Sequence, residues 1–203
     1  MTEATSTEWW SAVRLPALIQ TDRLRLRPHA RGDGPALKAV IDANIEHLQR
    51  WMDWAMYEPS PLDVIEDRIA AFVAGFATGP DWGYGIRLID DPETIIGGCG
   101  MHARIGINAL EIGYWLDSKH TGRGYATEAT AALVDAAFSM PMIEHVEIRC
   151  DPANVASAAV PRRLGFAYVT TLQKNAKTPR GDPRDTKVFA ITRTMFSTLS
   201  KLA

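Results

Sequence analysis

The segment from Glu111 to Ala129 constrains the fold more than any other part of the chain. It starts as a strand-like stretch, passes through a turn that contains Gly122 and Gly124, and continues into an Ala-rich helical pattern. Glycines let the backbone bend and approach a ligand closely, and the helix start near Arg123 offers unpaired N–H groups and a positive dipole. The sequence therefore predicts a strand, turn and helix that bind an anion such as pyrophosphate.

Two common phosphate-binding motifs are excluded at this turn. The dinucleotide-binding fingerprint needs a third glycine at the position where Thr127 stands. The nucleoside-triphosphate loop ends in Gly-Lys-Ser/Thr, whereas Gly122 is followed by Arg123, Gly124 and Tyr125. The expected ligand therefore carries phosphate but is bound by neither of these two motifs.

Hydrophobic periodicity assigns the rest of the chain to alternating groups of strands and helices. We expect strands over 23–28, 82–89, 94–102, 110–116, 143–149, 166–171 and 186–194, with a polar loop before the last one, and helices over 33–57, 62–77, 123–138 and 154–163. Runs of consecutive strands favour a mixed sheet of the α+β class. The length of 203 residues suits one domain over 1–203, with 1–17 as an N-terminal extension.

Charge and residue types exclude several classes of partner. Lys and Arg number 22 against 24 Asp and Glu, so the chain has no strong positive field for nucleic acid or an acidic membrane. No His, Cys, Asp or Glu cluster has metal-ligand spacing, and Cys99 and Cys150 are expected to be buried and reduced. The acidic N-terminal stretch is unlike a signal peptide, which predicts a cytoplasmic protein.

The glycine turn resembles the coenzyme A loop of the GNAT superfamily of N-acetyltransferases, whose pattern is Arg/Gln-x-x-Gly-x-Gly/Ala. The residues here are Thr121-Gly122-Arg123-Gly124-Tyr125-Ala126. Thr121 departs from the Arg or Gln of the first position. This departure weakens one phosphate contact and leaves the backbone amides in place.

Other segments are similar to the RimJ/RimL-like branch of this superfamily. They are Thr21-Asp-Arg-Leu-Arg-Leu-Arg-Pro28, Glu111-Ile-Gly-Tyr-Trp-Leu116, and Asn154-Val-Ala-Ser157 followed by Arg163-Leu-Gly-Phe166. The resemblance implies an acyl-CoA N-acyltransferase fold with a mixed, mostly antiparallel, seven-stranded sheet. It also implies helices on both sides and an opening between strands four and five, which splay apart around the pantetheine arm.

The same resemblance implies acetyl-CoA as cosubstrate, with no metal. Its expected contacts are Tyr114, Trp115, Leu116, Thr121, Gly122, Arg123, Gly124, Tyr125, Ala126, Thr127, Asn154 and Ser157. A β-bulge within 114–116 would free a backbone N–H for the oxyanion of the tetrahedral intermediate. Asn154 has an alternative role as a helix cap.

Acetyl transfer to an amine also needs a proton acceptor and a proton donor for the departing thiolate. Glu111 is the predicted base, although it could instead bind the ammonium or be a solvated strand-end residue. Ser157 is the predicted hydroxyl near the thiol, with helix capping as its alternative. Glu128 is expected to be structural, while His102 and His120 are weaker candidates for proton transfer.

The amine acceptor is not fixed by the sequence. Trp51 and Trp54, three residues apart, and Tyr84 are candidate substrate contacts, and Asp53 could hold a cation between the tryptophans. Core packing explains these aromatic residues equally well. Three functions stay open: acetylation of a protein N-terminal α-amine, acetylation of a small amine or antibiotic, and non-catalytic acyl-CoA sensing.

The sequence offers two interpretations of Trp9 and Trp10 near the start of the chain. They could bury against a second copy and form a homodimer, or fold back onto the chain's own core. The basic 174–187 segment likewise suits either an acidic partner or a solvated hairpin.

Overall fold

The computed structural model describes residues 8–178, 181–199 and 201. The strands among them are β1 (Ile19–Gln20), β2 (Leu24–Pro28), β3 (Asp81–Leu88), β4 (Gly97–His102), β5 (Ala109–Leu116), β6 (His145–Cys150), β7 (Ala167–Lys177) and β8 (Pro183–Thr192). The α-helices are α1 (Gly34–Asp42), α2 (Ile45–Leu48), α3 (Leu62–Thr78), α4 (Tyr125–Phe138), α5 (Val155–Arg163) and α6 (Arg193–Leu199). Short 3₁₀ helices are η1 (Trp9–Ala12), η2 (Asp53–Tyr57) and η3 (Ser118–His120).

The described strands form one eight-stranded sheet in the order β1-β2-β3-β4-β5-β6-β8-β7. Neighbouring strands are antiparallel except β5 and β6, so the α+β class and the mixed sheet are confirmed. The prediction of seven strands is wrong by one. Strand β1 has two residues, too few for a period-2 pattern to reveal it.

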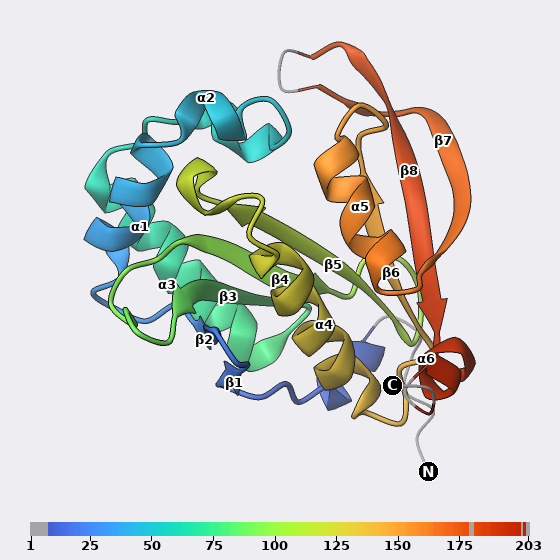
Figure 1. Ribbon diagram of the computed structural model, residues 1–203. Helices are drawn as coiled ribbons and strands as arrows, with labels where there is room; N and C mark the ends of the chain where they lie inside the picture. Colours follow the sequence, from blue (N-terminus) through green and yellow to red (C-terminus); the bar gives the residue numbers. More distant parts are fainter. Residues whose placement is uncertain (1–7, 179–180, 200, 202–203) are drawn as a thin grey trace.

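The expected polar loop before the last strand is instead a long hairpin. Strand β7 continues to Lys177 and β8 begins at Pro183, and residues 179–180 of the hairpin lie outside the described part. Figure 1 shows this hairpin rising beside α5, at the far end of the sheet from β1. Its polar composition reflects an exposed edge strand, since both faces of β7 are largely open to water.

The helices bury two apolar clusters against the sheet. Figure 1 shows α4 and α5 in front of the sheet and α3 behind it. The main core joins α4 to β2–β6, and Leu24, Leu26, Ile112 and Leu133 in it are at most 1% exposed. A smaller cluster packs α1 and α3 around Ile41, Ile65 and Ile69. Trp9 and Trp10 pack onto the main core, as the second interpretation of these residues predicted.

Cys99 and Cys150 are both buried and unpaired, which confirms the prediction of reduced thiols. Among the described helices, none has both the length and the apolar character needed to cross a membrane.

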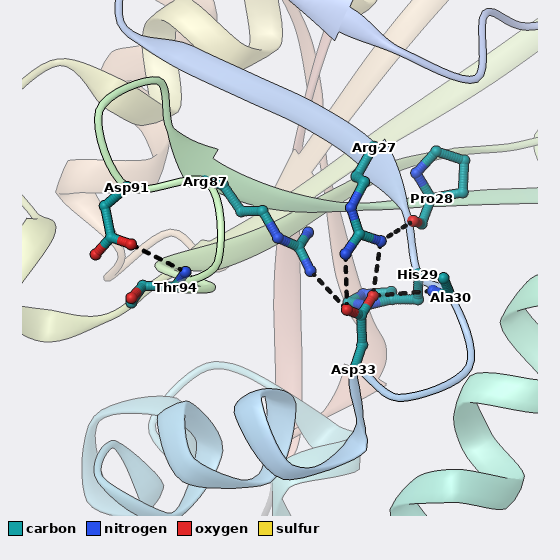
Figure 2. A network of polar contacts seen from close by, with 8 residues as sticks. All are labelled: Arg27, Pro28, His29, Ala30, Asp33, Arg87, Asp91 and Thr94. Carbon is teal, nitrogen blue, oxygen red and sulfur yellow. Dashed lines mark hydrogen bonds and ion pairs between the residues drawn. The ribbon is translucent and has the colours of Figure 1, made fainter.

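A polar cluster joins α1 to the sheet on the side away from α4 (Figure 2). The Asp33 carboxylate accepts two hydrogen bonds from Arg27, at 2.8 and 2.9 Å, and lies 3.0 Å from Nη2 of the fully buried Arg87. The Ala30 amide donates a further hydrogen bond to Asp33, at 2.9 Å. One carboxylate thus pairs with two guanidinium groups where the chain passes from β2 into α1.

His29 borders this cluster and makes stability depend on pH. Burial, assisted by the nearby arginines and opposed by Asp33, lowers the pKa of His29 from 6.5 to about 4. Between pH 6.5 and 4 the unfolded chain therefore binds a proton that the folded chain does not, so the free energy of unfolding falls as the pH falls. The full difference is roughly 3 kcal/mol at about 1.36 kcal/mol per pH unit.

We expect His29→Gln to flatten this part of the stability profile. Urea unfolding of both proteins at pH 7, 6, 5 and 4.5 measures the two profiles, and the stability of the wild type relative to the variant should fall as the pH falls. Parallel profiles would mean that folding does not lower the pKa of His29.

Candidate active site

The opening between β5 and β6 is the central feature of the site. The two strands pair only from Ala109↔His145 to Glu111↔Glu147, although β5 continues to Leu116 and β6 to Cys150. Beyond the last pair the strands separate, as the resemblance implied for strands four and five (Figure 1). The sheet is therefore held together on one side of the Glu111–Glu147 pair and open on the other.

Backbone amides of β5 face this opening. The Asn108 carbonyl accepts a hydrogen bond from Glu144 on the β6 side, whereas the Asp117 amide donates to Ile96 on the β4 side. Backbone groups alternate along a strand, so the N–H groups of residues 112, 114 and 116 point toward β6, where pairing has ended. The predicted β-bulge is wrong, because the β4–β5 register is continuous. Strand separation, not a bulge, frees the donors.

The glycine turn lies between β5 and α4, next to the opening. Gly122 and Gly124 have φ values of 72° and 82°, which glycine adopts without strain. The exposed turn leads into α4, whose first amides have no partner within the helix. The Thr121 hydroxyl donates to the Ser118 carbonyl at 2.8 Å, so this side chain stabilises the turn itself.

Glu128 in the first turn of α4 anchors the helix to the sheet. Its carboxylate accepts hydrogen bonds from the Thr21 hydroxyl at 2.6 Å and from Arg23 Nε at 2.7 Å. Burial opposes ionisation, but these hydrogen bonds and the Arg23 charge together lower the pKa of Glu128. Arg23 also lies over the Tyr125 ring, 4.7 Å from its centroid. This structural role for Glu128 agrees with the sequence prediction.

On the α5 side of the opening, two hydroxyl groups meet. The Tyr114 hydroxyl donates to the Ser157 carbonyl at 3.0 Å and lies 3.2 Å from the Ser157 hydroxyl. Asn154 caps α5, since its side-chain oxygen accepts a hydrogen bond from the Ser157 amide at 3.0 Å. Burial raises the pKa of Tyr114, so the phenol is protonated at neutral pH. Sequence reasoning considered only the backbone of Tyr114 and missed this phenol.

Glu111 lies at the foot of the opening and is 7% exposed. Its carboxylate accepts hydrogen bonds from Arg104 Nε at 3.0 Å and Arg104 Nη2 at 2.6 Å. Arg149 Nε lies 4.0 Å away, while Arg149 itself is bound to Glu147 at 2.9 Å. Glu111 is therefore shielded from solvent and paired with Arg104. Arg104 and Arg149 were not among the predicted site residues.

His102 occupies the neighbouring position on β4, directly across from Glu111. Its Nδ1 lies 2.6 Å from an oxygen of Asp81 on β3. Its Nε2 points toward Gly113 and is 3.7 Å from the position that a Cβ atom on this glycine would occupy. Hydrogen bonding at Nδ1 leaves Nε2 free to take a proton, so this histidine is a second candidate for proton transfer. By contrast, the other candidate, His120, pairs with Asp117 beside the glycine turn.

The predicted substrate contacts are in different surroundings. Trp54 packs edge-to-face on Trp115, with ring centroids 5.9 Å apart, and the Trp51 carbonyl accepts from Arg184 at 3.3 Å. Tyr84 is 1% exposed and its hydroxyl donates to the Pro16 carbonyl, so the structure places it in the core. Trp54 lies near the opening because Trp115, on which it packs, is on β5.

Arg184 on β8 links the segment around η2 to the residue that follows β6. Besides Trp51, it lies 3.7 Å from Asp53 in η2 and 3.9 Å from Asp151 after β6. The cation expected beside Asp53 is thus supplied by the chain itself. Within the described residues, no group of three or more His, Cys, Asp or Glu side chains could hold a metal ion.

The comparisons with known proteins agree with this geometry. The family model described as "Acetyltransferase (GNAT) domain" matches residues 23–167. The chain is 30% identical over 145 residues to "Putative ribosomal N-acetyltransferase YdaF" of Bacillus subtilis (strain 168), which covers 66% of this chain and 72% of YdaF. It is 35% identical over 98 residues to "Uncharacterized protein YkkB" of the same organism, covering 45% of this chain but only 57% of YkkB.

A solved structure has a similar fold. It is RimL, a ribosomal L7/L12 alpha-N-protein acetyltransferase in complex with coenzyme A, with a TM-score of 0.77 and 24% identity. The superposition covers 86% of this chain and 97% of RimL.

Proposed function

This chain belongs to the GNAT acetyltransferase family, and we propose that its acceptor is the α-amine of a protein N-terminus. As a member of that family it is an acetyl-CoA-dependent N-acetyltransferase. The similarity to YdaF, named as a putative ribosomal N-acetyltransferase, and the RimL fold support a protein acceptor. The opening between β5 and β6, with unpaired amides on one edge and Glu111 at its foot, supports acetyl transfer, and the similarity to YdaF carries the choice of acceptor.

The residues fit coenzyme A in two places. Amides of the turn and first helical residues, 122–127, would hold the pyrophosphate at the positive end of α4. Edge amides of Ile112, Tyr114 and Leu116 would pair with the pantetheine arm in place of the missing part of β6. Asn154 contributes by fixing the start of α5, which positions Ser157.

Each chemical step then has a residue near it. Glu111 accepts the proton that the attacking amine loses as its nitrogen bonds to the thioester carbonyl carbon. An edge amide of β5 stabilises the negative oxygen of the tetrahedral intermediate. When the carbon–sulfur bond breaks, the Ser157 hydroxyl, hydrogen-bonded to Tyr114, passes a proton to the thiolate and is reprotonated from water, while the Glu111 carboxyl releases its proton to water. The products are the acetylated amine and coenzyme A with a free thiol.

Gly124→Ala is expected to weaken coenzyme A binding by about tenfold, because a left-handed conformation costs a side-chain-bearing residue roughly 1–2 kcal/mol. Gly124 has φ 82°, and relief of this strain would tilt the amides that follow it. Isothermal titration with coenzyme A measures the loss. Gly75→Ala, in α3, is the matched control, since the nearest atom would be at an ordinary 3.4 Å. Equal affinities would mean that the turn does not bind the pyrophosphate.

The acceptor is tested by thiol release from acetyl-CoA with N-terminal peptides, free amino acids, polyamines and aminoglycosides. Turnover with peptides alone supports the proposal. Turnover with polyamines or aminoglycosides alone would replace it by small-amine acetylation. Tight coenzyme A binding without turnover on any acceptor would favour a non-catalytic acyl-CoA sensor.

A further inference from the structure

Glu111 has two cationic neighbours that differ in how firmly they are held. Arg149 makes two 2.9 Å contacts to Glu147, and its Nε stays 4.0 Å from Glu111. Arg104 has its hydrogen bonds to Glu111 itself, and its side chain is 58% exposed. Arg104 is the more exposed of the two arginines, so it is the partner that an incoming cation can displace.

The charges at the foot of the opening are balanced before an acceptor binds. Glu111 and Glu147 face each other as the last β5–β6 pair, and Arg104 and Arg149 neutralise them. An amine reaches the site as an ammonium ion and adds one positive charge. If that ammonium takes the place of Arg104 on Glu111, the Arg104 guanidinium is left without a carboxylate.

We propose that Arg104 is a specificity-determining residue that pairs with a carboxylate of the acceptor, close to the amine that is acetylated. This inference rests on the proposed function, because it assumes that Glu111 receives the acceptor amine. Binding is then an exchange in which one ion pair within the enzyme is replaced by two between enzyme and acceptor. The favoured substrates are N-termini with an acidic side chain on the first or second residue.

The distances suit this class of acceptor. Arg104 Nη2 is 2.6 Å from Glu111 before an acceptor binds, so an acceptor amine at Glu111 brings its own first residues next to the Arg104 side chain. An extended chain advances about 3.3–3.6 Å per residue, so an acidic side chain on residue one or two reaches that side chain.

Asp81 is the rival partner for a displaced Arg104. The hydrogen bonds to Glu111 are the main cause of the raised pKa of Arg104, and the Asp81 charge adds to it. Asp81 is already bound to His102, at 2.6 Å, and its side chain is 62% exposed. If Asp81 captured Arg104, the enzyme would not distinguish acidic from neutral acceptors.

Three peptides that differ only at residue two, Ser-Glu, Ser-Gln and Ser-Lys, test the proposal. We expect kcat/KM to fall in that order for the wild-type enzyme, by about tenfold from Glu to Lys, as one attractive contact is replaced by one repulsive contact. Arg104→Glu should reverse the order, and Arg104→Met should remove it. Ratios within one enzyme preparation do not depend on the folded fraction, so a partly unfolded variant still gives an answer.

Equal rates on the three peptides, or an unchanged order in Arg104→Glu, would overturn the role of Arg104 while leaving N-terminal acetylation intact. Acetylation of free amino acids but of no peptide would instead overturn the proposed function. In that case the role of Arg104 is tested by comparing free glutamate with its α-amide as acceptors. The wild type should prefer glutamate, and Arg104→Glu should prefer the α-amide. If neither protein distinguishes the acid from the amide, the proposed exchange of ion pairs is wrong.

Discussion

Glu111→Gln should lower kcat/KM for a peptide acceptor by about 10²–10⁴-fold, the usual contribution of a positioned general base. Glutamine has nearly the same size and keeps an oxygen for Arg104, but its neutral amide cannot take the proton from the amine. Because Glu111 is at the foot of the opening, away from the glycine turn, the KM for acetyl-CoA should stay the same. Initial rates with both substrates varied separate the two constants.

His102→Gln is the matched comparison for this variant. His102 lies across from Glu111 on β4, and its Nε2 faces Gly113. If Glu111 is the base, His102→Gln should retain most of the rate. A larger loss in His102→Gln than in Glu111→Gln would transfer the role of proton acceptor to the His102–Asp81 pair.

Much of the fold follows from local sequence patterns. The strand, turn and helix around Gly122 and Gly124 appear where periodicity and glycine placement predict them, with α4 starting at Tyr125. The Asn154 cap, which the sequence offered as the alternative to a coenzyme A contact, is present, because capping depends on a side chain and an amide three residues apart. Such features are local, so a single sequence contains their cause.

Contacts that depend on register were harder to predict. Tyr114 and Ser157 are separated by 43 positions, and their contact requires the particular separation of β5 from β6. The Arg104–Glu111 pair had a visible signal. A basic residue two positions after one strand and an acidic residue near the start of the next lie close together at the hairpin turn, where Glu111 is paired with His102 and Arg104 reaches it from the turn.

The arginines of β2 show how a correct strand assignment can miss an interaction. Alternation of Arg23, Arg25 and Arg27 with apolar residues indicated a half-exposed strand. The structure instead places Arg25 directly across from Arg87, which is fully buried, and ties Arg27 to Asp33. An arginine in β3 carries no pattern that distinguishes a buried ion cluster from a solvated face, so Arg87 could not have been assigned from sequence.

Asp33→Asn should lower the free energy of unfolding by about 3–5 kcal/mol, because removing one partner of a buried ion pair leaves an uncompensated charge. Here two guanidinium groups lose their common carboxylate, and that of Arg87 is buried (Figure 2). Domains are stable by only about 5–15 kcal/mol, so the variant would lose a large part of its stability. Urea unfolding at pH 7, followed by circular dichroism, gives the difference.

Asp42→Asn is the control, because Asp42 pairs with Lys38 at 2.8 Å on the surface of the same helix, with both side chains partly exposed. Loss of a surface pair should cost at most about 1 kcal/mol. Adding Arg87→Met to Asp33→Asn should restore part of the stability, since the apolar side chain removes the buried charge that Asp33 neutralised. If Asp33→Asn costs no more than Asp42→Asn, water must solvate Arg87 in the folded protein. The attachment of α1 to the sheet would then depend on its apolar contacts alone.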